Sequence, residues 1–217
     1  MVATTHSLKP ETTRLAGRAA TIALAGITYF AMIIIALHLL RPDHNPISRP
    51  TSEYAVGPYG YLMTSAFFSM SLASGALVIG LYQGVPRPAQ SRLGLGLLAI
   101  WAMGVFIAML FPIDLDGVPQ TLPGTIHAIN GPLTFLSLTI GVLLVSRSFK
   151  QDETWRPIYR SAVLLSLLML VEFVGVPLAM ATGSGLAGLA QRIFLVTFGT
   201  WFVMTAMHLC AIAVRSA

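Results

Sequence analysis

Six long apolar segments are the feature that most constrains the fold of this chain. Each is 18 to 25 residues long, and together they contain only one Asp, Glu, Lys or Arg, which is Glu172. An α-helix needs about 20 residues to cross the hydrocarbon of a bilayer, because each residue adds about 1.5 Å. The segments therefore predict membrane-crossing helices, and they cover residues 19–40, 58–82, 93–111, 128–145, 161–180 and 193–214.

Composition indicates the same class of protein. Hydrophobic residues make up 55% of the chain, charged residues 10%, and the mean hydropathy is +0.77, far from the averages of soluble domains. We therefore predict an all-α integral membrane protein, a six-helix bundle that forms a single transmembrane domain over residues 1–217. Membrane lipid is then one partner. The net charge of +5 does not predict a nucleic-acid partner, because membrane proteins collect lysine and arginine on their cytoplasmic side.

Basic residues are divided unequally between the connections. Ten of the 13 lysines and arginines, Lys9 among them, lie in the N-terminus, in connections 83–92 and 146–160, and in the C-terminal tail. The positive-inside rule then places both termini in the cytoplasm and predicts a multi-pass protein of the cell membrane. The three poorer connections, which are residues 41–57, 112–127 and 181–192, are predicted to lie outside.

Polar side chains gather on the predicted outer side. We predict that these residues form a polar cup at the mouth of the helical bundle, in which a small-molecule ligand is bound or sensed. The candidate ligand-binding residues are Asn45, Glu53, Glu172 and Arg192.

Glu172 is the only Asp, Glu, Lys or Arg inside a predicted helix. It precedes Met180 by eight residues, which places it about 12 Å below the outer end of its helix. An acid at that depth is costly unless it is protonated, paired or facing a wet cavity, so it is treated by default as functional. Arg192 and His127 are its candidate partners. The alternatives are a proton-linked carrier site and a structural hydrogen bond between helices.

A second group of residues is compatible with catalysis. Asp114 and His127 flank the second outer connection, and Ser52 is a candidate nucleophile that requires a nearby base such as His127 or His44. A catalytic zinc held by His38, His127 and Asp114 would suit a hydrolase, because such zinc sites use three protein ligands and an open position. The structural alternatives are a solvated turn at Asp114 and helix capping by Ser52.

Two stretches of sequence resemble a known family. They are NPIS followed by SEYAVGPYG after the first segment, and FPID with DG followed by TIHAINGPLTF, which runs into the fourth segment. This pattern is similar to that of the domain-of-unknown-function 998 family of bacterial and archaeal membrane proteins, and the likeness covers nearly the whole chain. The matching positions are Asn45, Ser48, Ser52, Glu53, Phe111, Pro112, Asp114 and His127. The resemblance implies the six-helix architecture and these candidate residues, and it implies no reaction.

A looser likeness links the chain to the seven-helix ceramidase and progestin-receptor superfamily, whose membrane hydrolases use zinc. The present chain lacks a seventh segment and the paired histidines of the last helices. Three hypotheses follow. The preferred one is a membrane protein that binds or senses an unidentified small molecule in an outer polar cup. The alternatives are a membrane hydrolase, with or without a metal ion, that acts at the outer surface, and a small proton-linked carrier that uses Glu172.

Overall fold

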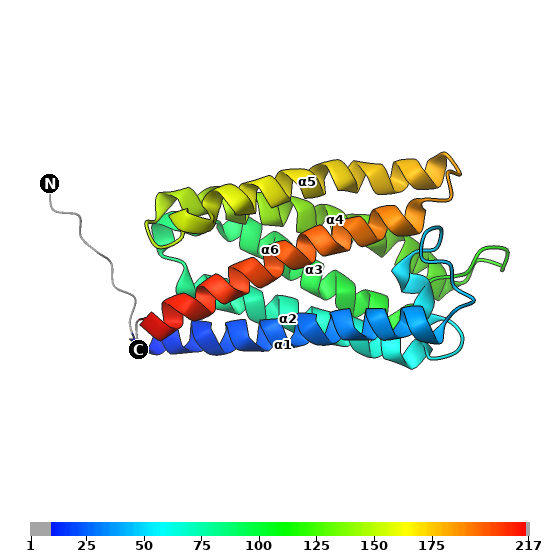
Figure 1. The fold of residues 1–217 in the computed structure, drawn as a ribbon, viewed down its shortest axis with the longest axis horizontal. Coiled ribbons are helices and arrows are strands. Elements are labelled where there is room, and N and C mark those ends of the chain that lie inside the picture. The colour runs from blue at the N-terminus through cyan, green and yellow to red at the C-terminus, as the bar shows by residue number, and fades with distance from the viewer. Residues whose placement is uncertain (1–9, 216–217) are drawn as a thin grey trace, which may run out of the picture.

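The computed structural model describes residues 10–215, and this part of the chain contains helices and no strand (Figure 1). The long helices are α1 Pro10–Leu40, α2 Gly60–Gly84, α3 Arg92–Leu110, α4 Leu122–Ser148, α5 Arg156–Ala181 and α6 Ala187–Arg215. Short 3-10 turns occur in the connections at η1 Thr51–Ala55, η2 Arg87–Ala89 and η3 Phe149–Gln151. Each long helix has the length and apolar character needed to cross a membrane. The predicted all-α, six-helix membrane fold is therefore confirmed.

Several helices extend beyond the apolar segments that predicted them. α1 begins at Pro10 instead of residue 19, and α4 begins at Leu122 instead of residue 128. Hydropathy identifies the part of a helix that fits hydrocarbon, whereas backbone hydrogen bonds continue wherever capping residues allow them. At the start of α4, Thr121 accepts a hydrogen bond from the Gly124 N–H at 3.1 Å, which caps the helix before the apolar segment begins.

The six helices form a closed ring in sequence order. Each packs against its neighbours in the chain, and α6 also packs against α1 (Figure 1). Helices α1, α3 and α5 end at one end of the bundle, where the connections 41–59, 111–121 and 182–186 lie. We call this the long-loop end. The opposite end, where α1 begins and α6 ends, is called the terminus end; Lys9 lies outside the described residues.

The half of the bundle at the terminus end is closely packed. A Cβ atom on Gly84 of α2 would overlap the side chain of Leu209 on α6. The two helices can therefore approach this closely only because residue 84 has no side chain. Two buried tryptophans add hydrogen bonds across helices: Trp155 donates to the Gly84 carbonyl at 3.3 Å, and Trp201 donates to Ser146 at 2.9 Å. Trp155 and Trp201 are the two largest fully buried side chains of the described residues.

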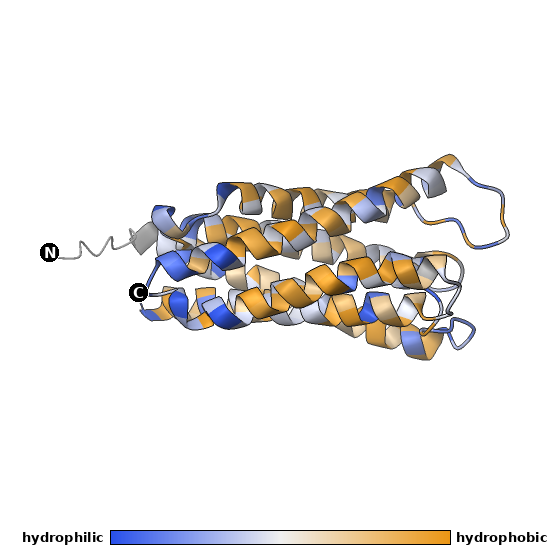
Figure 2. Ribbon diagram, turned by 90° about the horizontal axis from the view of Figure 1, so that it is seen from above, coloured by the Kyte–Doolittle hydropathy of each residue, from blue (hydrophilic) through white to orange (hydrophobic). Residues whose placement is uncertain are grey.

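Hydropathy along the helices agrees with a membrane setting. Figure 2 shows apolar residues over the middle of the bundle and hydrophilic residues towards its two ends. Large exposed side chains such as Leu133 on α4 and Val171 on α5 are apolar and face outwards. Exposed apolar surface of this extent is expected where lipid replaces water.

Candidate functional site

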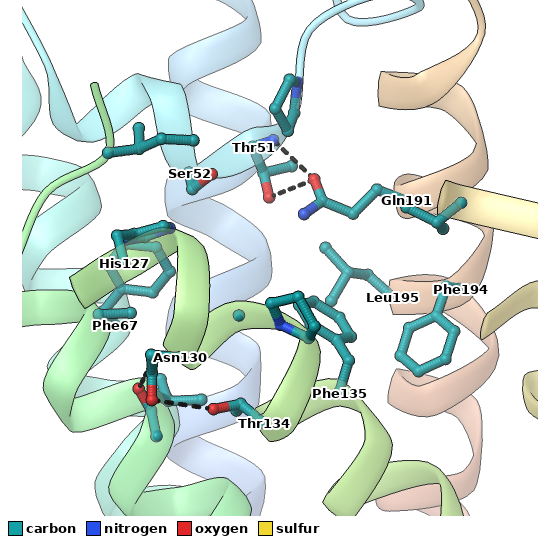
Figure 3. A pocket seen from close by; sticks show the side chains of 18 of the residues that line it. Thr51, Ser52, Phe67, His127, Asn130, Thr134, Phe135, Gln191, Phe194 and Leu195 are labelled. Carbon is teal, nitrogen blue, oxygen red and sulfur yellow. Dashed lines mark hydrogen bonds between the residues drawn. The ribbon is translucent and has the colours of Figure 1, made fainter. Parts of the chain in front are cut away.

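A cavity of about 410 Å³ occupies the middle of the ring, in the half nearer the long-loop end (Figure 3). All six long helices contribute to its wall, and η1 covers it at the long-loop end. The wall is mainly apolar and aromatic. Its larger apolar members are Phe30, Phe67, Met70, Trp101, Val105, Phe135, Phe173, Val176, Phe194 and Leu195. A volume of this size is within the range of ligand pockets for small molecules.

Polar groups are concentrated at one end of this central cavity. Pro50, Thr51 and Ser52 of the connection between α1 and α2 form its cover, and Gln191 lies beside them on α6. The side-chain oxygen of Gln191 accepts hydrogen bonds from the Thr51 N–H at 2.8 Å and the Thr51 hydroxyl at 3.0 Å (Figure 3). We call residues 41–59 the roof segment. These two hydrogen bonds between Thr51 and Gln191 hold the roof segment over the cavity.

A buried cluster of charged and aromatic side chains supports the roof segment from behind. Glu53 pairs with Arg49 at 2.6 Å and lies 3.8 Å from the His44 Nε2 atom. The Tyr54 ring, which is fully buried, lies against the His44 ring with 4.0 Å between centroids. Burial raises the pKa of Glu53, and the positive charge of Arg49 opposes that rise. These contacts give the connection a small core of its own.

Arg192 ties this cluster to two helices. Its Nε atom donates to His38 Nε2 on α1 at 3.0 Å, and one terminal nitrogen donates to the Arg49 carbonyl at 2.8 Å. The other ring nitrogen of His38 lies 2.6 Å from the Ile34 carbonyl, so it carries the proton and leaves Nε2 as the acceptor. Arg192 therefore joins α6, α1 and the roof segment.

His127 faces the cavity from the second turn of α4. Its Nδ1 atom lies 2.8 Å from the Phe111 carbonyl, and because a carbonyl only accepts, Nδ1 carries the proton. In a neutral ring the Nε2 atom is then an acceptor, and it has no hydrogen-bond partner among the described residues. Deeper in the wall, Asn130 donates to the Gly104 carbonyl and accepts from Thr134, so its amide is occupied (Figure 3).

Asp114 has a structural partner close by. Its two oxygens accept hydrogen bonds from the Thr121 N–H at 2.7 Å and the Thr121 hydroxyl at 2.8 Å. Because Thr121 caps α4, the carboxylate fixes the connection 111–121 against the start of that helix, where the helix dipole also favours a negative charge. Asp116 is exposed beside Gly117, whose backbone φ is +82°.

The structure thus brings together only some of the predicted site residues. Ser52 and His127 line the same cavity, whereas Glu53 and Arg192 belong to the cluster behind the roof segment. Asn45 turns the backbone of that segment, accepting from the Ile47 N–H at 2.9 Å.

From the sequence we expected Glu172 to pair with Arg192 or His127. In the structure it pairs with neither. Instead one of its oxygens accepts from Thr197 of α6 at 2.8 Å, and Glu172 is not among the residues that line the cavity. The expectation was wrong because Arg192 is already bound to His38 and to the roof segment, both of which are far from residue 192 in the sequence.

The zinc site expected from His38, His127 and Asp114 is not assembled. In residues 10–215, no three His, Cys, Asp or Glu side chains are placed so that they could hold a metal ion. The reason is that each side chain has a different neighbour: Arg192 for His38, the Phe111 carbonyl for His127 and Thr121 for Asp114.

Most of the cavity wall was missed by sequence reasoning, including three members that carry a polar group or a large ring. They are Thr51, Gln191 and Trp101. Gln191 precedes Arg192 at the start of the sixth apolar segment, and an uncharged amide there carries no pattern that distinguishes a ligand-facing position from an ordinary helix start. Only the fold, which brings residue 191 next to residue 51, identifies it.

A bundle of six membrane-crossing helices around a buried cavity defines this chain as a polytopic membrane protein. A family model described as "Protein of unknown function (DUF998)" matches residues 23–208, and the chain belongs to that family. Neither the comparison with curated proteins nor the comparison with solved structures gives a match.

The buried position of His44 leads to a pH-dependent stability. Burial, assisted by the charges of Arg192, Arg49 and Arg41, lowers the pKa of His44 from 6.5 to about 4. Between these two pH values the unfolded chain binds the proton and the folded chain does not, so the folded protein loses stability as the pH falls from 6.5 towards 4. The variant His44→Phe keeps a ring against Tyr54 but has no group to protonate. The loss of folding stability that His44 causes between pH 6.5 and pH 4 should therefore be absent from it.

The measurement is the apparent melting temperature of both proteins in detergent across this pH range. We expect the decline of the variant to be smaller by a few degrees, since about 1 kcal/mol shifts the melting temperature of a chain of this size by about 2–4 °C. Parallel declines in the two proteins would show that His44 is not the group responsible.

Proposed function

We propose that this chain is a membrane-embedded binding protein that holds an apolar small molecule in the central cavity beneath the roof segment. The observation that supports this most directly is the cavity itself, because closely packed helices rarely leave a space of about 410 Å³ between them. An apolar wall with a few polar groups at one end is the usual composition of a ligand pocket. The roof segment contacts the cavity on one side and water on the other, which suits it to sense occupancy.

The basic residues support an orientation for this protein. Within the described residues the terminus end carries Arg14, Arg18, Arg87, Arg92, Arg147, Lys150, Arg156, Arg160 and Arg215. The long-loop end carries three arginines, each of which is bound to a carboxylate, a histidine or a carbonyl. The positive-inside rule then favours a cytoplasmic terminus end and a cavity that lies in the outer half of the cell membrane.

The cavity can be tested with a small uncharged aryl diazirine added to the protein in lipid nanodiscs. Photolysis should label Trp101 and Phe194, which line the cavity and are too deeply buried for bulk lipid to reach. Val105→Trp should fill the cavity, and an overpacking cost of about 1–3 kcal/mol corresponds to a loss of this labelling of about fivefold to 150-fold.

The matched control for that experiment is Met103→Trp, on the same helix but 59% exposed on its outer face. It should leave the labelling of Trp101 and Phe194 unchanged. If the wild-type protein is labelled only at its lipid-facing surface, the cavity does not accept an apolar molecule and the proposed function fails.

The orientation is tested by cysteine labelling in intact cells. In a Cys210→Ser background, a membrane-impermeant maleimide should react with Asp116→Cys and should not react with Gln151→Cys until the cells are opened. Both positions are exposed, one at each end of the bundle. The reverse pattern would place the long-loop end in the cytoplasm.

A second candidate function, hydrolysis or acyl transfer, is favoured by one observation. Ser52 and His127 line the same cavity, and the proton on His127 Nδ1 leaves Nε2 in the form that a general base requires. No hydrogen bond joins the two side chains in the described structure, so this function also requires a shift of the roof segment. A fluorophosphonate that reacts with the wild type and with neither Ser52→Ala nor His127→Phe would establish it; an unreactive wild type would exclude a serine nucleophile.

A further inference from the structure

Three polar groups that face the central cavity are not used by the protein's own hydrogen bonds. The Gln191 oxygen accepts twice from Thr51, so the Gln191 amide NH₂ remains as a donor. His127 Nε2 remains as an acceptor, and the Ser52 hydroxyl can both donate and accept. They come from α6, α4 and the roof segment, and all lie at the covered end of the cavity (Figure 3).

The same wall contains no charged side chain. None of the residues that line the cavity is Asp, Glu, Lys or Arg. An ion brought into such a wall would lose its hydration without gaining a counter-charge, which costs several kcal/mol or more. The unused donor and acceptors therefore suit an uncharged polar head, and a hydroxyl group matches them in kind because it can both donate and accept a hydrogen bond.

The remaining space suits an aliphatic chain. At about 30 Å³ for each water-sized group, a cavity of about 410 Å³ has room for about a dozen methylene-sized groups. Aromatic side chains such as Phe135 and Phe194 form the wall away from the three polar groups (Figure 3). The site thus combines one small polar end with one longer apolar end.

The wall between α4 and α5 is where the cavity meets the outer surface of the bundle. Ala128 and Pro132 on α4 and Pro177 on α5 line the cavity and are also exposed. Ala128 and Pro132 lie about 9 and 15 Å along α4 from its first residue, below the level of the connections. Their neighbours Ile129 and Leu133 are more than 60% exposed and apolar. The opening therefore faces the lipid rather than the water.

Both helices are interrupted at this opening. Proline has no N–H group, so Pro132 leaves the Ala128 carbonyl, and Pro177 leaves the Phe173 carbonyl, without the regular helical donor. Ala128 and Phe173 both line the cavity. A polar head that passes between α4 and α5 thus meets carbonyl acceptors on the way, which lowers the cost of moving it through hydrocarbon.

From these observations we propose that the ligand is an uncharged single-chain amphiphile with a hydroxyl head, such as a long-chain alcohol, and that it enters from the membrane between α4 and α5. The inference rests on the proposed binding function and adds to it the chemical class of the ligand and its route. The roof segment, held by Thr51 and Gln191, closes the path from water.

The test compares three photoactivatable probes of about a dozen carbons in nanodiscs that carry the full chain. They share one diazirine-labelled chain and end in a hydroxyl, in a methyl or in a trimethylammonium group. We expect saturable labelling of Trp101 and Phe194 by the alcohol, about tenfold above that by either analogue. Ser52→Ala and Gln191→Leu should lower the ratio of alcohol to alkane labelling, a change that a merely loosened cavity would not produce because it would affect both probes equally.

The route is tested with two tryptophan substitutions on adjacent residues of α4. Ala128→Trp narrows the opening and should slow labelling by alcohol already present in the membrane about tenfold, whereas Ile129→Trp faces lipid, does not line the cavity and should leave the rate unchanged. Equal rates in the two variants would overturn the lateral route.

The outcomes separate the two levels of the proposal. Labelling by the trimethylammonium or methyl probe equal to that by the alcohol would overturn the ligand class, while cavity labelling by the aryl diazirine would still support a binding function. If the aryl diazirine also fails to label Trp101 and Phe194, the binding function itself is wrong.

Discussion

The need to satisfy every backbone polar group away from water is the constraint on which this structure depends. The six long helices meet nearly all of that need within themselves, the exceptions being the two carbonyls that face Pro132 and Pro177, and irregular backbone is confined to the ends of the bundle. The roof segment is the longest connection at the long-loop end. It meets the same need with side chains, since Arg41 donates to the carbonyls of Val56 and Pro58 at 3.0 and 3.1 Å and Arg192 donates to that of Arg49. Polar side chains are thus concentrated where the chain cannot be helical.

The cavity follows from an unequal distribution of packing along the ring. At the terminus end, glycines and small residues of α2 let α1 and α6 approach α2 closely, and buried tryptophan side chains fill the remaining space between the helices. At the long-loop end, prolines interrupt α4 and α5, and the aromatic side chains stand around a space instead of closing it. The roof segment can cover this space because residues of α6 bind it from one side and α2 follows it directly in the chain.

Most of the fold was predictable from sequence, because hydrocarbon imposes a length and a composition on any crossing helix. The number of helices, their order and the position of the polar residues near the long-loop end all follow from the six apolar segments. The site was only partly predictable. Ser52 and His127 were expected and line the cavity, but Gln191 was not, since its role depends on Thr51, which is 140 residues away in the chain.

The pairing of charges was the least predictable feature. Arg192 was expected beside Glu172 because both were assigned to the outer half of neighbouring helices. In the structure it turns instead towards α1 and the roof segment, while Glu172 hydrogen-bonds to Thr197. Spacing along a helix gives the depth of a residue but not which of two neighbouring helices it faces, and that choice depends on packing details of the whole ring.

The contacts of Arg192 have a mechanical consequence. One guanidinium group links α6, α1 and the roof segment, so these three elements form a stiff side of the bundle. The side formed by α4 and α5 contains Pro132 and Pro177, which each remove one backbone hydrogen bond at a position where helices bend most readily. A wider ligand would therefore displace the wall formed by α4 and α5, while α6, α1 and the roof segment would keep their positions.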